Sequence, residues 1–326
     1  MRSGPRICIA LAMALTATAP QSYAAPARTV CEQRCLGGFV DKVLRAMMDH
    51  DPSRAPLAPD VRYTENGDTL KPGAGLWATA SAIAIEDDGL SSLGRQSSAY
   101  RLYFADPASG QAAYFGAFTE NGAPGMMMLR LRAIAGKVAE IETVIVRTGA
   151  GQGGDPAPPA FDPKGFDEPE PALLAGGERW APNIMTAAAN RYFDAMEKGS
   201  SLGVPLGADC VRRDNGVRAQ LGCAAEIDGG AFRSVIQVRR RVLVVDEDRG
   251  LVMAVALVDH GPPAETPKKK RKKTVQPPPA TAPITPSTDL IGAIFKMSEG
   301  KITHIEALER AAPYGMASAW PQAAGA

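Results

Sequence analysis

The fold is indicated by the stretch Pro56-Leu57-Ala58-Pro59-Asp60-Val61-Arg62-Tyr63-Thr64-Glu65-Asn66-Gly67, because a similar stretch occurs a second time in the chain. Its second form is Pro205-Leu206-Gly207-Ala208-Asp209-Cys210-Val211-Arg212-Arg213-Asp214-Asn215-Gly216. From Pro56 to Pro205, and again from Gly67 to Gly216, the offset is 149 residues. A period this long indicates two copies of a domain, since solenoid repeats run at roughly 20–50 residues.

A second matched pair closes each copy and locates an insertion. Residues 134–142, Ile-Ala-Gly-Lys-Val-Ala-Glu-Ile-Glu, match residues 297–306, Met-Ser-Glu-Gly-Lys-Ile-Thr-His-Ile-Glu, and Gly136 corresponds to Gly300 at an offset of 164. The offset has grown from 149 to 164, so copy two has gained 15 residues. We therefore predict copy one at 31–148, a Pro/Gly/acidic linker at 149–183, and copy two at 184–315 with a disordered basic insertion at 262–286.

The first residues resemble a secretory signal, which we expect to span 1–24. Arg2 and Arg6 precede a short apolar run, and Ser22-Tyr23-Ala24 offers a small-x-Ala cleavage site. No later stretch reaches the roughly 18 apolar residues of a membrane span, so we expect no stable membrane insertion. The sequence predicts a periplasmic or secreted protein.

Four cysteines remain after the signal: Cys31, Cys35, Cys210 and Cys223. An even number in an oxidising compartment favours disulfides, and two local bridges are the simplest of the three possible pairings. The alternative, a redox or metal site, lacks the Cys-x-x-Cys spacing and the clustered histidines that it needs. We expect no metal and no cofactor.

The charge of the chain is concentrated in one loop. The formal charge is +1, but setting aside the signal and the basic run 268–273 leaves 28 basic against 35 acidic residues, or −7. The basic run matches a nucleic-acid-binding pattern only superficially, because it has no interleaved aromatic residues for stacking on bases. A solvated insertion, or weak contact with an anionic envelope surface, remains as its interpretation, and no nucleic-acid partner is expected.

Each copy has a helical region followed by a meander of strands. Phe39, Val43 and Met47 recur at helical spacing, and Met185 to Met196 form the second helix. Strands are expected first at 61–64 and in the hairpins 98–104/112–119 and 126–134/138–146. In copy two the corresponding strands are expected at 235–245, 251–258, 290–297 and 302–308. The pattern predicts an α+β class: two copies of a cone-shaped fold with helices packed on a curved antiparallel sheet.

This arrangement resembles the nuclear transport factor 2-like superfamily, whose SnoaL-like members form a cone. The resemblance rests on the helical segment 40–46, on the stretch Ala58 to Gly67, and on the closing segment 136–142. It implies an uncharacterised exported branch with tandem copies and a conical apolar pocket. The superfamily includes both enzymes and pure binding domains, so the resemblance alone leaves the function open.

Three acidic or imidazole groups are the candidate catalytic residues. Glu65 precedes the Asn66-Gly67 turn, and there it could act as a general base or simply bind backbone amides of the turn. His304 and Glu306 share one face of the last strand, where they could form an acid–base pair or face water.

The remaining candidates would line a ligand pocket. They are aromatic or polar residues near the repeated stretches: Tyr63, Asn66, Trp77, Tyr100, Tyr103, Arg212 and Asp214. Core packing is the alternative role for the aromatic residues, which are concentrated in copy one. The sequence thus predicts an exported pocket protein for a small, largely apolar molecule, with acid–base chemistry of the isomerase, lyase or hydrolase type. The alternative is a non-catalytic structural or interaction protein whose two copies pack on each other.

Overall fold

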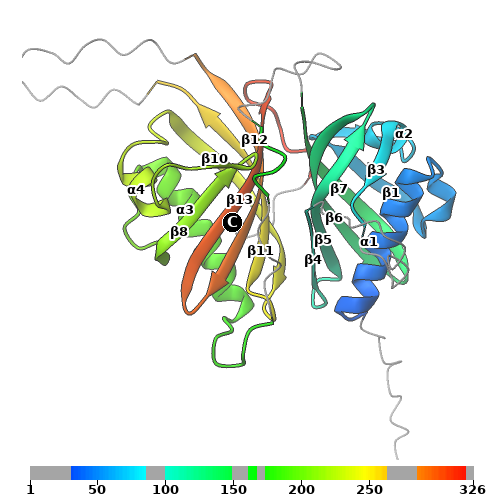
Figure 1. The fold of residues 1–326 in the computed structure, drawn as a ribbon, viewed down its shortest axis with the longest axis horizontal. Coiled ribbons are helices and arrows are strands. Elements are labelled where there is room, and N and C mark those ends of the chain that lie inside the picture. Colours follow the sequence, from blue (N-terminus) through cyan, green and yellow to red (C-terminus); the bar gives the residue numbers. More distant parts are fainter. Residues whose placement is uncertain (1–30, 86–99, 149–160, 167–172, 263–284, 321–326) are drawn as a thin grey trace, which may run out of the picture. The chain divides into compact units, whose positions relative to one another are not determined.

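The computed structural model describes residues 31–85, 100–148, 161–166, 173–262 and 285–320, and its ribbon is shown in Figure 1. The predicted signal at 1–24 lies outside the described residues. So does most of the basic insertion and of the linker, and these predictions stay predictions.

Two sheets and their helices make up the described chain. The elements of copy one are α1 (Gln33–Met48), η1 (Pro52–Arg54), β1 (Leu57–Glu65), β2 (Asp68–Leu70), α2 (Leu76–Thr79), β3 (Ala80–Ile83), β4 (Arg101–Asp106), β5 (Gln111–Glu120), β6 (Ala123–Ile134) and β7 (Lys137–Arg147). Those of copy two are α3 (Pro182–Lys198), β8 (Leu206–Asp214), β9 (Val217–Arg218), α4 (Cys223–Asp228), β10 (Val235–Asp246), β11 (Leu251–His260), β12 (Ser287–Ser298) and β13 (Lys301–Ala312).

The two sheets have the same strand order, which confirms the predicted α+β duplication. The first runs β2-β1-β7-β6-β5, with β3 and β4 both paired to β5, and the second runs β9-β8-β13-β12-β11-β10. The strands are antiparallel except at one place in each sheet, where β1 pairs in parallel with β7 and β8 with β13. This parallel pair joins the first long strand of each copy to its last.

The matched turns adopt the same backbone conformation in both copies. Asn66 and Gly67 have φ of 53° and 86°, and Asn215 and Gly216 have φ of 50° and 81°. Two successive positive φ values are typical of the Asn-Gly turn that joins two strands, and they explain why this dipeptide occurs in both copies.

One amphipathic helix covers the inner face of each sheet. In α1 the buried positions Leu36, Val40, Val43, Leu44 and Met47 recur at helical spacing. Helix α3 begins with Pro182 at its first turn and ends at Gly199, whose φ of 62° gives the left-handed C-cap. Together, helix and sheet enclose a separate apolar core in each copy.

A third apolar cluster lies between the outer faces of the two sheets. Its members come from both sheets and include Phe115, Met128, Met253 and Ile294, with Phe166 of the linker fully buried among them. The cluster is bordered by a buried ion network in which Glu142 binds both Arg130 and Arg241. Because buried charges need partners, this network restricts how the two faces can be paired.

The segment after β13 crosses from copy two to copy one. Gly315 N donates to Thr288 Oγ1 in copy two, whereas Trp320 Nε1 donates to Thr64 Oγ1 in copy one at 2.9 Å. The Trp320 ring is also stacked by the guanidinium groups of Arg62 and Arg130, 4.6 and 4.9 Å from its centre. The last described residues of the chain therefore complete the surface of the first copy.

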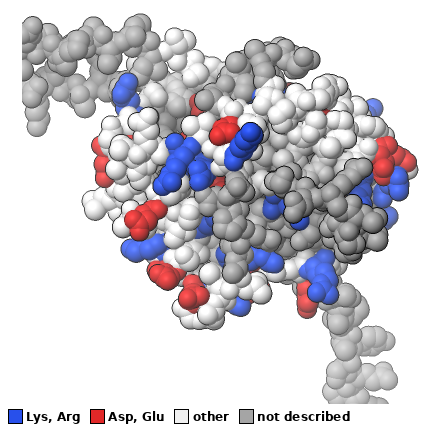
Figure 2. Space-filling model, in the orientation of Figure 1, with Lys and Arg blue, Asp and Glu red and all other residues white. Residues whose placement is uncertain are grey.

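Both predicted disulfides are present, linking Cys31 to Cys35 and Cys210 to Cys223. On the face shown in Figure 2, acidic and basic side chains are interspersed over the described residues. No helix in the described part of the chain combines the length and the apolar composition that crossing a membrane requires.

Candidate active site

In copy one, Glu65 is held by three partners. Its Oε2 accepts hydrogen bonds from the Tyr63 hydroxyl (2.9 Å) and from Leu76 N (2.7 Å), and its Oε1 is 3.0 Å from Arg147 Nη2. Leu76 begins α2, so the carboxylate ties the end of β1 to that helix. Both carboxylate oxygens thus have partners, and the backbone amide that Glu65 binds belongs to α2 and not to the Asn66-Gly67 turn.

The other copy-one candidates fill the core. Tyr63 and Trp77 are fully buried and meet edge to face at 5.9 Å, and Trp77 Nε1 donates to Ala46 O at 3.1 Å. Asn66 lies in its turn, and its Oδ1 accepts a hydrogen bond from Ile145 N at 2.8 Å. The structure thus brings Tyr63, Glu65 and Trp77 together, as packed side chains.

Tyr103 packs against the border of that core, whereas Tyr100 packs against the apolar cluster between the two sheets. Tyr103 packs edge to face on Tyr114 and lines a groove of about 770 Å³ beside the start of α1, together with Asp41 and Arg249. The hydroxyl of Tyr100 donates to Glu306 Oε2 at 2.6 Å.

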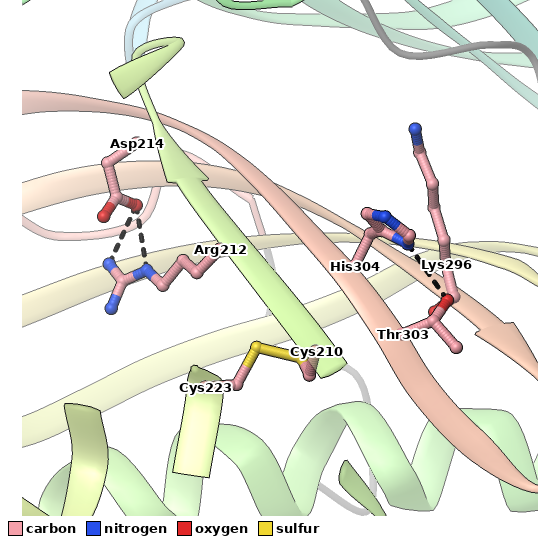
Figure 3. The surroundings of a disulfide bond; sticks show 7 residues. All are labelled: Cys210, Arg212, Asp214, Cys223, Lys296, Thr303 and His304. Atoms are coloured by element: carbon pink, nitrogen blue, oxygen red, sulfur yellow. Dashed lines mark hydrogen bonds and ion pairs between the residues drawn. A yellow bond between two sulfur atoms is a disulfide. The ribbon is translucent and has the colours of Figure 1, made fainter. Parts of the chain in front are cut away.

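His304 and Glu306 face away from the copy-two core. Ile305 and Ala307 of β13 belong to that core, so the alternating residues His304 and Glu306 point to the opposite side of the sheet. Glu306 is buried there, 3.2 Å from Lys296 Nζ, while His304 Nδ1 lies 3.2 Å from Thr303 Oγ1. Figure 3 shows Lys296, Thr303 and His304 on these neighbouring strands.

Arg212 and Asp214 project from β8 on the same side as Cys210, and Figure 3 shows them paired beside the Cys210–Cys223 disulfide. Arg212 Nε and Nη2 are 3.0 and 2.8 Å from Asp214 Oδ1. The guanidinium is buried and lies 4.5 Å from the ring centre of Phe232. Because the disulfide joins β8 to α4, it fixes this strand against the segment that carries Phe232.

Glu309 is a second carboxylate close to Arg212, and the sequence analysis did not single it out. It follows Ile305 and Ala307 on the core side of β13, and its Oε2 is 4.0 Å from Arg212 Nη2. Asn215 fixes its backbone, since Asn215 Oδ1 accepts from Glu309 N and Asn215 Nδ2 donates to Glu309 O, both at 2.9 Å. The repeated Asn-Gly turn therefore positions Glu309.

The surroundings of Glu309 place its protonation equilibrium near neutrality. Burial of the carboxyl, reinforced by Asp214 and Asp289, outweighs Arg212 and His260 and raises the pKa of Glu309 to about 7. A carboxyl with this pKa can both accept and donate a proton at neutral pH.

Tyr192 of α3 brings a buried hydroxyl to the same place. Its side chain is 3% exposed, and the guanidinium of Arg212 beside it favours the ionised hydroxyl, but among the described residues no group accepts the hydroxyl proton. Burial raises the pKa of Tyr192 to about 12, so the hydroxyl keeps its proton at neutral pH. An unpaired buried donor is uncommon and costs free energy, and a bound ligand atom would remove that cost.

His260 and Asp289 complete the polar end of this core. Each lies two residues from a core residue of its strand, Val258 on β11 or Ile291 on β12, and so faces the same side of the sheet. His260 Nε2 is 2.9 Å from Asp289 Oδ2. The hydrogen bond to Asp289 outweighs burial and raises the pKa of His260, with further help from the charge of Glu309. We call Tyr192, Arg212, Asp214, His260, Asp289 and Glu309 the polar end of copy two.

The sequence prediction missed four members of this group: Tyr192, His260, Asp289 and Glu309. The last three fall one or two residues outside the expected strands at 251–258, 290–297 and 302–308. The observed strands β11, β12 and β13 are longer than expected and include these three residues. The repeat carried a usable signal, since at the offsets of 149 and 164 Tyr192 stands where copy one has Val43, and Glu309 where it has Ile145.

Within the described residues, no group of three or more His, Cys, Asp or Glu side chains could hold a metal ion. The side chains of the polar end offer proton transfer by Glu309 and hydrogen bonding to an oxygen by Tyr192 and Arg212.

The chain is similar to one family model and to several solved structures. Residues 178–309 match the family model described as a domain of unknown function (DUF8021). Among solved structures, the chain is similar to a SnoaL-like polyketide cyclase from Agrobacterium tumefaciens, at 12% identity and a TM-score of 0.26, over 38% of this chain and 90% of that one. It is also similar to a candidate ketosteroid isomerase from Kribbella flavida, at 10% identity and a TM-score of 0.26.

The Kribbella match covers 44% of this chain and 87% of the other. No curated protein matches the chain. The identities and TM-scores of these matches are low, and no activity is inferred from them.

Proposed function

We propose that the protein binds a small, largely apolar molecule at the polar end of copy two and moves a proton from one atom of that molecule to another. Glu309 would be the acid–base group. The observation that carries this proposal is the buried, unpaired Tyr192 hydroxyl beside Arg212, within the same cluster as Glu309. These groups come from a helix and two different strands, and they converge although nothing in the fold's core requires a polar residue there.

The arrangement suits proton abstraction next to a carbonyl. Glu309 would take a proton from the carbon beside the carbonyl and return it elsewhere. The Tyr192 hydroxyl would donate a hydrogen bond to the oxygen on which charge develops, and Arg212 would stabilise that charge. The apolar core around Phe232 and Val258 would hold the remainder of the molecule.

Copy one supports the non-catalytic alternative for its own half. Its core is filled by Tyr63, Trp77 and Tyr114, and Glu65 is bound by its neighbours. We propose that copy one serves as a scaffold for copy two. We also propose that the protein works in the periplasm or outside the cell, since its two disulfides persist best in an oxidising compartment.

The test measures exchange of α-hydrogens for deuterium in phenylacetone, cyclohexanone and 2-tetralone by proton NMR. The protein should accelerate exchange of at least one ketone, and Glu309→Gln should lower that acceleration by about 100-fold or more. Tyr192→Phe should lower it by about tenfold or more. The control is Glu247→Gln, which removes an exposed carboxylate in the β10–β11 turn and should leave exchange unchanged.

A second measurement uses 2-naphthol, an aromatic mimic of an enol, and follows its fluorescence on binding. Binding should weaken in Tyr192→Phe and in Arg212→Lys. If no ketone exchanges faster than in buffer and 2-naphthol does not bind, the proposal is wrong.

A further inference from the structure

Ser234 extends the His260–Asp289 pair into a chain of three groups that the proposed proton transfer does not use. Ser234 lies just before β10, and its Oγ is 2.9 Å from His260 Nδ1. On the other side of the ring, His260 Nε2 is 2.9 Å from Asp289 Oδ2. Both ring nitrogens thus have a partner, a hydroxyl on one and a carboxylate on the other.

We propose that Ser234 is a nucleophile for acyl esters, activated by His260 and oriented through Asp289. The defining requirement is geometric: a hydroxyl within reach of one imidazole nitrogen, with a carboxylate bound to the other nitrogen. With the imidazole proton held on Nε2 by Asp289, the Nδ1 lone pair faces the Ser234 hydroxyl.

The backbone around Ser234 fixes this geometry. Gly261 N donates to Ser234 O and Val235 N to Phe232 O, both at 2.9 Å. Val235 pairs with His260 across β10 and β11, and His260 pairs with Ser287 across β11 and β12. The three side chains therefore come from neighbouring positions at one end of the sheet, where β10 and β12 begin and β11 ends. Each of the three residues is partly exposed.

The reaction conserves every atom. Ser234 Oγ forms a bond to the carbonyl carbon of the ester while its proton moves to His260 Nδ1. The bond from that carbon to the alcohol oxygen breaks, and the Nδ1 proton passes to the departing alkoxide. Water then attacks the acyl-serine with its proton again going to Nδ1, and that proton returns to Ser234 as the carboxylic acid leaves.

The neighbouring charges determine the working pH range. Asp289, Glu309 and Asp259 favour protonated imidazole and raise the pKa of His260 above 6.5, against burial. Because only neutral imidazole can accept the serine proton, activity should rise with pH through a midpoint above 6.5. Arg212 and Asp214 face Glu309 from β8, so they modulate this midpoint indirectly.

The test uses a fluorophosphonate–biotin probe on the full-length oxidised protein, with peptide mass spectrometry to locate the label, and 4-nitrophenyl acetate hydrolysis as the second readout. We expect the label on Ser234, an initial burst of 4-nitrophenol, and loss of both in Ser234→Ala. His260→Gln retains hydrogen-bonding capacity toward both neighbours but should lower labelling by about 100-fold. Ser287→Ala, which removes an exposed hydroxyl opposite His260, is the matched control and should label like the wild type.

Labelling at another residue, or equal labelling of wild type and His260→Gln, would overturn the proposal. Its failure is distinguishable from failure of the proton-transfer function. Ser234→Ala should abolish the labelling and keep ketone exchange, so the loss of one activity leaves the other measurable.

Discussion

The two copies have the same strand order and the same Asn-Gly turn, yet the ends of their cores differ in chemistry. Copy one has Val43, Tyr63, Trp77 and Ile145 where copy two has Tyr192, Arg212, Glu226 and Glu309. The first set packs into a filled core, whereas the second brings together a cation, carboxyls and an unpaired hydroxyl. The same sheet can therefore enclose either an apolar core or a polar cluster, and a few core-facing positions determine the chemistry of each copy.

The largest loss of stability should come from a substitution at Glu142. The equivalent residue of copy two provides the comparison. At the offset of 164 the equivalent is Glu306. Glu142→Gln would remove the charge paired with the buried Arg241 and one of the two carboxylates paired with Arg130, and should cost about 3–5 kcal/mol in the free energy of unfolding. Glu306→Gln removes the partner of one cation, Lys296, and should cost less. Urea unfolding measures both, and a larger loss in Glu306→Gln would contradict the expectation.

The disulfide of copy two comes next. Copy one has Val61 and Ala74 where copy two has Cys210 and Cys223. Replacing both cysteines with serine removes a bridge between residues 13 apart and should lower stability by about 3 kcal/mol. Hydrogen exchange should report lost protection in α4 and not in α2. Equal protection of the α4 amides in the wild type and in the double serine variant would show that the disulfide does not stabilise α4.

Glu309 should make stability depend on pH in a way that copy one does not. A carboxyl whose pKa rises from 4.5 unfolded to about 7 folded binds its proton more tightly in the native state. Its contribution is therefore favourable at low pH and is lost as pH rises from about 4.5 to 7, by up to about 3 kcal/mol.

Glu309→Gln should consequently flatten the pH dependence between pH 5 and 8 and should be more stable than wild type at pH 8. Urea unfolding at the two pH values tests this, with Glu247→Gln as the exposed control. Unchanged pH dependence in Glu309→Gln would show that Glu309 is not the responsible group.

Glu65→Gln should have the smallest effect. The glutamine can still accept from Leu76 N, but it loses the charge paired with Arg147, which should cost about 1–2 kcal/mol. Thermal unfolding measures this loss. If the main effect of Glu65→Gln is instead lost ketone exchange, then the general-base interpretation holds and the site belongs to copy one.

The fold could be predicted because its signals are local and occur twice. The Asn66-Gly67 and Asn215-Gly216 turns require positive φ, and the closing turns at Gly136 and Gly300 have the same φ of 76°. The parallel pairing of β1 with β7 could not be anticipated, because it joins strands separated by most of the domain.

The candidate site was less predictable because its residues lie at strand ends. His260, Asp289 and Glu309 are polar and follow apolar runs, a pattern that also describes the start of a loop. Glu65 illustrates the opposite difficulty, since its role depends on Arg147, 82 residues away. A carboxylate beside a turn looks the same in sequence whether its partners are present or absent.

The position of Trp320 affects how the chain can be made. Its indole donates to Thr64 across 256 residues, and it stacks on Arg62 and Arg130 of copy one. Synthesis proceeds from the N-terminus, so copy one emerges first and must wait until Trp320 has been made before this indole can cover it. A truncated chain that stops in the linker would therefore present Thr64 and the two guanidinium groups to water, and the last step of assembly belongs to the first half of the molecule.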